Sequence, residues 1–187
     1  RDGVSLRVAL DYPGPIFRLL WRGRGPKINA TNGSIQLRYE AIDTMETGAG
    51  PLAQAAADAN LDLVQENDGR GYICSNQLGP NGRPIAFVFS GDTDDEDGSD
   101  IWLTPEDIRS SVNVKQLEEG HAYPLYYDTL YNDLREECTA SMQDAKSAGL
   151  GVWAQDRTLA GAEWDDDVAA LAPLFPKLWR RIDRYVR

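Results

Sequence analysis

The sequence predicts an α+β fold, because strand-like and helix-like patterns occur in separate segments of one chain. Several segments alternate polar and apolar residues or are rich in β-forming residues, as strands are, whereas others place apolar residues at the three-to-four-residue spacing of helices. With 187 residues, the chain is long enough for one domain with a substantial core and a short extension. We therefore expect a single hydrophobic core.

The strand predictions fall into two hairpins. Val4–Leu10 alternates polar and apolar residues, and the pair Asn32-Gly33 is a hairpin signal that leads into a strand over Ser34–Ile42. Two further segments, Tyr72–Gln77 and Pro84–Ser90, are rich in β-forming residues and are joined by turn residues. We expect the strands of each pair to lie side by side.

Three helices are expected between and after these strands. Leu52–Val64 has apolar residues at helical spacing and follows Pro51, a residue suited to a first helical turn. Ser111–Glu119 and Tyr131–Ala148 show the same periodicity, and Gly149 is a suitable C-terminal cap for the second of them.

The segment Lys177–Arg187 predicts an amphipathic basic helix, with five basic residues and one acidic residue. Its apolar residues Leu178, Ile182 and Tyr185 share one face. Two interpretations follow. In the favoured one, this face packs on the domain and the bases lie in water, and in the other the helix contacts a membrane or nucleic acid.

The charge distribution along the chain limits which partners the protein can bind. The net charge of −11 and a pI near 4.5 argue against binding nucleic acid by bulk electrostatics. Residues 1–38, however, contain seven basic and two acidic residues, so a basic face on an acidic body is expected.

Residues 91–100 hold six acids and no base. This run lacks the glycine position and closing Glu of a calcium loop, and we interpret it as a solvated loop.

Other residue types offer little chemistry. Cys74 and Cys138 have no metal-ligand spacing, and two free thiols are favoured over a disulfide. His121 has no nucleophile pattern beside it, so we assign it no role. No stretch has the length of apolar sequence that a membrane span needs.

Four pieces of the sequence resemble the staphylococcal nuclease family (thermonuclease-like) in their order and spacing over residues 2–157. The most specific piece is residues 36–47, QLRYEAIDTMET, and it is followed by Gly50-Pro51 at the start of a helix. The other two pieces are residues 81–89, NGRPIAFVF, and the segments from Val112 to Tyr123 and from Ala148 to Ala154.

The resemblance implies an OB-type five-stranded β-barrel with three packed helices over residues 1–157, followed by a C-terminal helical extension over residues 158–187. It also implies catalytic roles for Arg38, Glu46 and Arg83, in which the two arginines hold a phosphate and Glu46 orients or activates water. Calcium is the implied cofactor, held by the Asp43 carboxylate and the Thr44 carbonyl, with Asp2 as a further candidate ligand.

These residue types suit phosphodiester hydrolysis on chemical grounds. A guanidinium binds phosphate oxygens bidentately, a carboxylate accepts a proton from water, and hard oxygens hold a divalent cation. Because the odd spacing from Arg38 to Asp43 would place them on opposite faces of a regular strand, the strand must end or bend before Asp43.

One position departs from the family pattern. Where the resemblance expects a second metal-binding Asp, this sequence has Val4, whose apolar side chain cannot ligate a cation. Weakened calcium dependence or activity is therefore expected.

Two functional hypotheses remain: a nuclease-like enzyme acting on DNA or RNA, and a catalytically inactive nuclease-fold module that binds protein or nucleic acid. Tyr126 is the candidate for a substrate contact, because aromatic side chains stack on bases.

Overall fold

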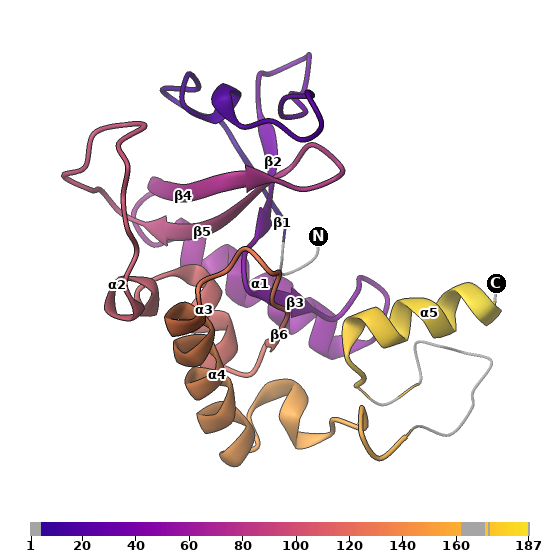
Figure 1. Ribbon diagram of the computed structural model, residues 1–187. Coiled ribbons are helices and arrows are strands. Elements are labelled where there is room, and N and C mark those ends of the chain that lie inside the picture. The colour runs from indigo at the N-terminus through magenta and orange to yellow at the C-terminus, as the bar shows by residue number, and fades with distance from the viewer. Residues whose placement is uncertain (1–4, 162–170, 172, 187) are drawn as a thin grey trace.

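The computed structural model describes residues 5–161, 171 and 173–186, and it has the expected mixed α+β fold (Figure 1). Helices lie mainly on one side of a twisted sheet, and the last helix lies at one end of the molecule (Figure 1). The prediction of an α+β class is therefore confirmed.

The larger sheet contains β1 (Ser5–Val8), β2 (Ile35–Tyr39), β5 (Pro84–Ser90) and β4 (Gly71–Leu78), in that spatial order. The pairs β1–β2 and β4–β5 are antiparallel, as expected for two hairpins, whereas β2 and β5 pair in parallel at the centre. The parallel pair joins the two hairpins into one sheet.

The expected five-stranded barrel is not found among the described strands. Strands β1 and β4 form the two edges of the sheet, and β3 (Ile42–Thr44) instead pairs with β6 (Ala122–Pro124) as a separate antiparallel ladder. The sheet stays open because β3 turns out of the line of β2. A cleft of about 1250 Å³ is lined by β1, β4 and the acidic loop.

The chain bends sharply between β2 and β3, as the spacing of Arg38 and Asp43 predicts. Ala41, in the bend, has a φ of 67°, in the left-handed region that L-residues rarely adopt. The fully buried Asn113 side chain donates hydrogen bonds from Nδ2 to the carbonyls of Glu40 (2.9 Å) and Ala86 (3.0 Å). Its Oδ1 accepts from the amide of Val88 at 3.0 Å. One side chain thus fixes the bend to β5.

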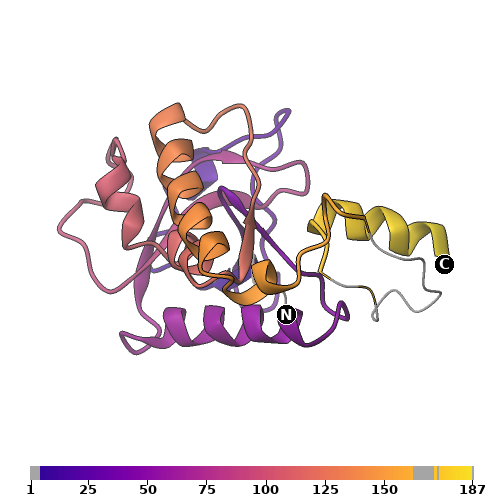
Figure 2. The ribbon, with the colours of Figure 1, turned by 90° about the horizontal axis from the view of Figure 1, so that it is seen from below.

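The main helices are α1 (Pro51–Gln65), α3 (Val112–Glu118) and α4 (Asn132–Ser147), close to the predicted bounds. In the view of Figure 2, α1 runs below the body and α4 crosses it. A short helix α2 (Pro105–Arg109) was not expected. It begins with a capping box in which Thr104 and Asp107 exchange hydrogen bonds.

Two clusters of buried side chains form the interior. The main cluster joins β2 and β5 to α3 and α4 through residues such as Leu37, Phe87, Val114 and Leu134. The second cluster lies beside the start of α1 and consists of Met45, Ala49, Ala53, Tyr123, Val152, Leu174 and Trp179.

Helix α5 (Pro176–Val186) packs on the second cluster, as the favoured interpretation expects, by a face that matches the expected one only in part. Trp179 is 5% exposed and Ile182 packs beside it, whereas Leu178 and Tyr185 are 37% and 89% exposed. Of the expected face, Ile182 therefore packs on the cluster whereas Leu178 and Tyr185 do not, because the buried contact is centred on Trp179, which lies beside that face. The C-terminal half of α5 extends beyond the body (Figure 2).

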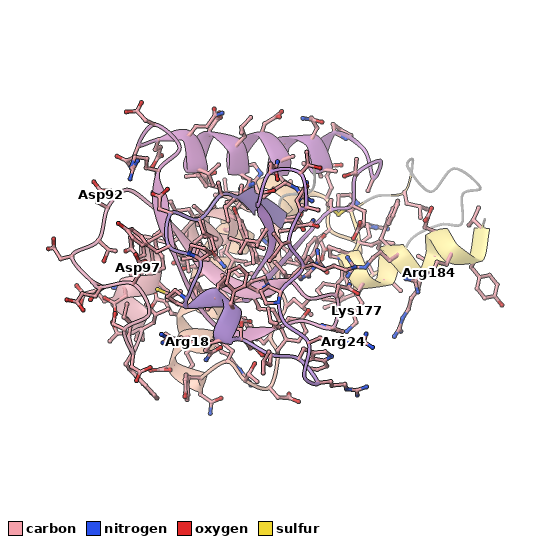
Figure 3. All side chains as sticks on the ribbon, turned by 90° about the horizontal axis from the view of Figure 1, so that it is seen from above. Arg18, Arg24, Asp92, Asp97, Lys177 and Arg184 are labelled. Carbon is pink, nitrogen blue, oxygen red and sulfur yellow. The ribbon has the colours of Figure 1, made fainter. Side chains whose placement is uncertain are left out.

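The ends of the molecule differ in charge. Asp92 and Asp97 lie at one end, and Lys177 and Arg184 of α5 lie at the other (Figure 3). The prediction of free thiols is confirmed, because neither Cys74 nor Cys138 forms a disulfide.

Candidate functional site

The bend between β2 and β3 carries a cluster of four charged side chains: Arg38, Asp43, Glu46 and Arg180. Arg38 Nη2 lies 3.1 Å from Asp43 Oδ1, and Arg180 Nη2 lies 2.7 Å from Asp43 Oδ2. Arg180 Nη1 contacts Glu46 Oε1. The guanidinium of α5 thus bridges both carboxylates.

Local sequence places these groups together. Arg38 lies one residue before the end of β2, and Asp43 is the central residue of the three-residue strand β3. Glu46 follows β3 by two residues, in the short connection to α1, where the Ala49 amide donates to the Glu46 carbonyl at 2.8 Å. The bend therefore brings three predicted site residues to one end of the sheet.

The electrostatics of the cluster depend on burial. Asp43 has no exposed side-chain surface, so its charge needs partners, and it has a guanidinium on each carboxylate oxygen. Partial burial lowers the pKa of Arg180, but its hydrogen bonds and charge attraction to Asp43 and Glu46 outweigh this effect and raise the pKa overall. Arg180 therefore stays charged at any working pH.

Arg83 lies on the same face of the sheet as Arg38. In the register, Ser5 of β1 pairs with Arg38, and Arg38 pairs with Ile85 of β5. Arg83 precedes Ile85 by two residues, which gives it the same side-chain direction. Its Nη1 donates to Ser5 Oγ at 3.3 Å. Ser5 is thus a neighbour of both arginines that the resemblance implicates in phosphate binding, as the register partner of Arg38 and the hydrogen-bond acceptor of Arg83.

Two buried polar atoms at the site lack hydrogen-bond partners among the described residues: Arg38 Nε and Thr44 Oγ1. Buried donors and acceptors are rarely left unsatisfied in folded proteins. Arg38 therefore has donor capacity beyond its contact with Asp43.

The arrangement does not fit a calcium ion. Calcium needs six to eight oxygen ligands, but both oxygens of Asp43 and one oxygen of Glu46 already accept from guanidinium groups. Within residues 5–161, 171 and 173–186, no group of three or more His, Cys, Asp or Glu side chains could hold a metal. Asp2, a predicted ligand, and Val4 lie outside the described residues.

The Tyr126 side chain contacts α4 and the main core. Its ring packs against the main core, and its hydroxyl shares a 2.8 Å hydrogen bond with Thr139 of α4. Burial raises the pKa of Tyr126 to about 12, so the hydroxyl is neutral. Its substrate role stays a prediction.

The sequence matches no protein-family model and no curated protein. In the part of the chain that the structure describes, no helix has the length and apolar character needed to cross a bilayer. Functional inference therefore depends on the site itself.

Arg180 is the site residue that sequence analysis missed. The basic amphipathic pattern of residues 177–187 indicates a helix with many cations, but it does not show which of them meets a carboxylate 137 positions earlier in the chain.

Proposed function

We propose that this protein is a nuclease-like phosphodiesterase that acts on nucleic acid. The observation that carries the proposal is the meeting of Arg38, Asp43 and Glu46 at the β2–β3 bend, with Arg83 beside the same strand pair. The resemblance of the sequence to staphylococcal nucleases supports the same assignment, and the OB-type barrel that this resemblance implies stays a proposal.

The chemistry would use these side chains in distinct roles. Arg38 and Arg83 offer permanently charged donors to the non-bridging oxygens of a phosphodiester, on which negative charge builds during attack. Glu46, 31% exposed, is the carboxylate that water can reach and is the candidate for orienting or deprotonating the nucleophile. Asp43, fully buried, would hold Arg38 in position.

The site contains three arginines, Arg38, Arg83 and Arg180, and two carboxylates. Its net charge is therefore one positive charge. This excess suits an anionic substrate even though the whole protein is acidic. A polyanion would meet this local field only at short range, since salt screens surface charges over about 8 to 10 Å.

The test is cleavage of end-labelled single-stranded DNA and RNA oligonucleotides by the native chain and by Glu46→Gln, which keeps the shape of the side chain. Glu46→Gln should slow cleavage by roughly 10²-fold or more, the usual contribution of a general base. Arg83→Ala should weaken oligonucleotide binding. Arg70→Ala, which removes an exposed arginine that pairs with Asp11, is the matched control. Equal cleavage by the native and Glu46→Gln proteins would refute the role of Glu46.

A second candidate function is a catalytically silent module that binds nucleic acid or protein. Its support is that Arg180 contacts the carboxylates of both Asp43 and Glu46, so that each of them has a guanidinium partner. Oligonucleotide binding without cleavage, in both the native chain and an Arg180→Ala variant, would favour this second function.

A further inference from the structure

We infer that the cleft lined by β1, β4 and the acidic loop (residues 91–100) binds an amphipathic organic cation, a molecule with an apolar body and an ammonium group. The cleft has a volume of about 1250 Å³, which is room for a small organic ligand. Among the described residues that line it, there is none to which the proposed function assigns a role. The inference is therefore independent of that function.

The wall of the cleft is an uncovered side of the main core. Most of the apolar side chains that pack against the main buried cluster and keep some exposed surface also line this cleft, among them Leu6, Val8 and Ile73. They come from both edge strands of the sheet, β1 and β4. Because burial of apolar surface is favourable, an apolar ligand body would be stabilised against this wall.

The acidic loop encloses one side of the cleft. Its Gly98 lies against the connection between β1 and β2, since a Cβ atom at Gly98 would be only 2.9 Å from Pro15 Cγ and 3.9 Å from Arg18 Nη1. The loop follows β5 in the chain and thus reaches the segment that follows β1. This contact brings the charges of the loop to the edge of an apolar cavity.

The lining of the cleft is acidic. Seven acidic side chains and three arginines line it, and five of these acids lie between Asp92 and Asp100. The loop also lies away from α5 and its bases (Figure 3). Burial, and after it the charge of Asp95, raises the pKa of the Cys74 thiol to about 11, so this carboxylate acts on a group in the cleft wall. A cationic ligand is therefore attracted and an anionic one repelled.

Two exposed aromatic rings of the lining suit the ammonium group. The ring centroids of Trp102 and Tyr131 are 4.5 Å apart, and the two residues are 66% and 50% exposed. The face of an aromatic ring attracts a cation, and this attraction is the usual means by which proteins recognise quaternary ammonium groups. The ammonium group would contact these rings and the loop carboxylates, and the apolar body would contact β1 and β4.

The test uses two probes with the same apolar tail and opposite charges, octyltrimethylammonium and octyl sulfate, below the concentrations at which they form micelles. Calorimetric titration of the native chain should show one octyltrimethylammonium per chain, bound about tenfold or more tightly than octyl sulfate. Bound octyltrimethylammonium should also slow the modification of Cys74 by N-ethylmaleimide, because this thiol lines the cleft. The fully buried Cys138 should stay unmodified throughout.

Two variants test the charge and the aromatic contact separately. Asp95→Asn/Asp97→Asn should weaken octyltrimethylammonium binding by about fivefold or more, and Trp102→Ala by about threefold or more. All three residues are exposed, so the core is unchanged. The matched control is Asp58→Asn/Asp62→Asn, which removes two exposed carboxylates of α1 outside the cleft. It should bind within about twofold of the native affinity.

Other outcomes overturn the inference. Equal affinity for the two probes would show apolar adsorption alone, and an unchanged rate of Cys74 modification would place the probe outside the cleft. An equal loss of affinity in the α1 control would show a general effect of protein charge. Modification of Cys138 would show that the probe unfolds the chain instead of binding in the cleft. Oligonucleotide cleavage, which none of these measurements uses, tests the proposed function separately.

Discussion

Replacement of Asn113 by Ala should strongly destabilise the protein, because this buried amide connects the β2–β3 bend, β5 and α3. It donates to the carbonyls of Glu40 and Ala86 and accepts from the amide of Val88. The Ala86 carbonyl keeps a second donor, since the Glu40 amide lies 2.8 Å from it. The substitution therefore removes the hydrogen-bond partner of two buried backbone groups, the Val88 amide and the Glu40 carbonyl.

The magnitude follows from the cost of these two groups. A buried donor or acceptor left without a partner costs about 1 to 3 kcal/mol, so the loss should be about 2 to 6 kcal/mol. Asn113→Asp keeps the acceptor for Val88 but removes both donors and buries a charge, and should be no milder. Gln143→Ala, on the exposed side of α4, is the control and should change stability by less than about 0.5 kcal/mol.

Urea unfolding measures the effect through the free energy of unfolding and its denaturant slope. A lower midpoint with an unchanged slope would show a loss of stability without a change in the surface exposed on unfolding. A loss below about 1 kcal/mol for Asn113→Ala would refute the reasoning, because it would mean that water or other donors satisfy Val88 and Glu40.

Three further substitutions or measurements test separate features. Gly120→Ala should cost more stability than Gly149→Ala in thermal unfolding: both glycines have positive φ, but only at Gly120 would a Cβ overlap the Leu150 carbonyl oxygen. Burial raises the pKa of the Glu40 carboxyl above its usual 4.5. The native chain should therefore lose stability relative to Glu40→Gln as the pH rises through the pKa that Glu40 has in the folded protein. Melting temperatures of both proteins from about pH 4 to 8 would show this. Burial also raises the pKa of Cys74 to about 11, so alkylation by iodoacetamide at neutral pH should be much slower than for a free thiol.

Much of the local structure could be predicted because its signals are local. The helix after Pro51 and the strand over Pro84–Ser90 begin and end close to the predicted residues. The odd spacing between Arg38 and Asp43 required a bend, and the structure has one at Glu40 and Ala41. The site residues that this bend joins were therefore within reach of sequence reasoning.

The remaining features depend on long-range partners or on short elements. Strand β6 and helix α2 are three and five residues long, too short for a periodic pattern to identify. The pairing of β3 with β6 joins residues about eighty positions apart. In α5, the pattern indicated an apolar face, but Trp179 rather than Tyr185 is the residue that finds a buried site.

The separation of 137 residues between Asp43 and Arg180 has a consequence for the newly made chain. Ribosomes add about 5 to 20 residues each second, and a domain folds once its residues have emerged. Strands β2 and β3 and helices α1 to α4 therefore become available before α5 does. During synthesis, the acidic pair at the bend passes through a period without Arg180. The contacts of Arg180 with Asp43 and Glu46 can therefore form only after helix α5 has emerged and docked.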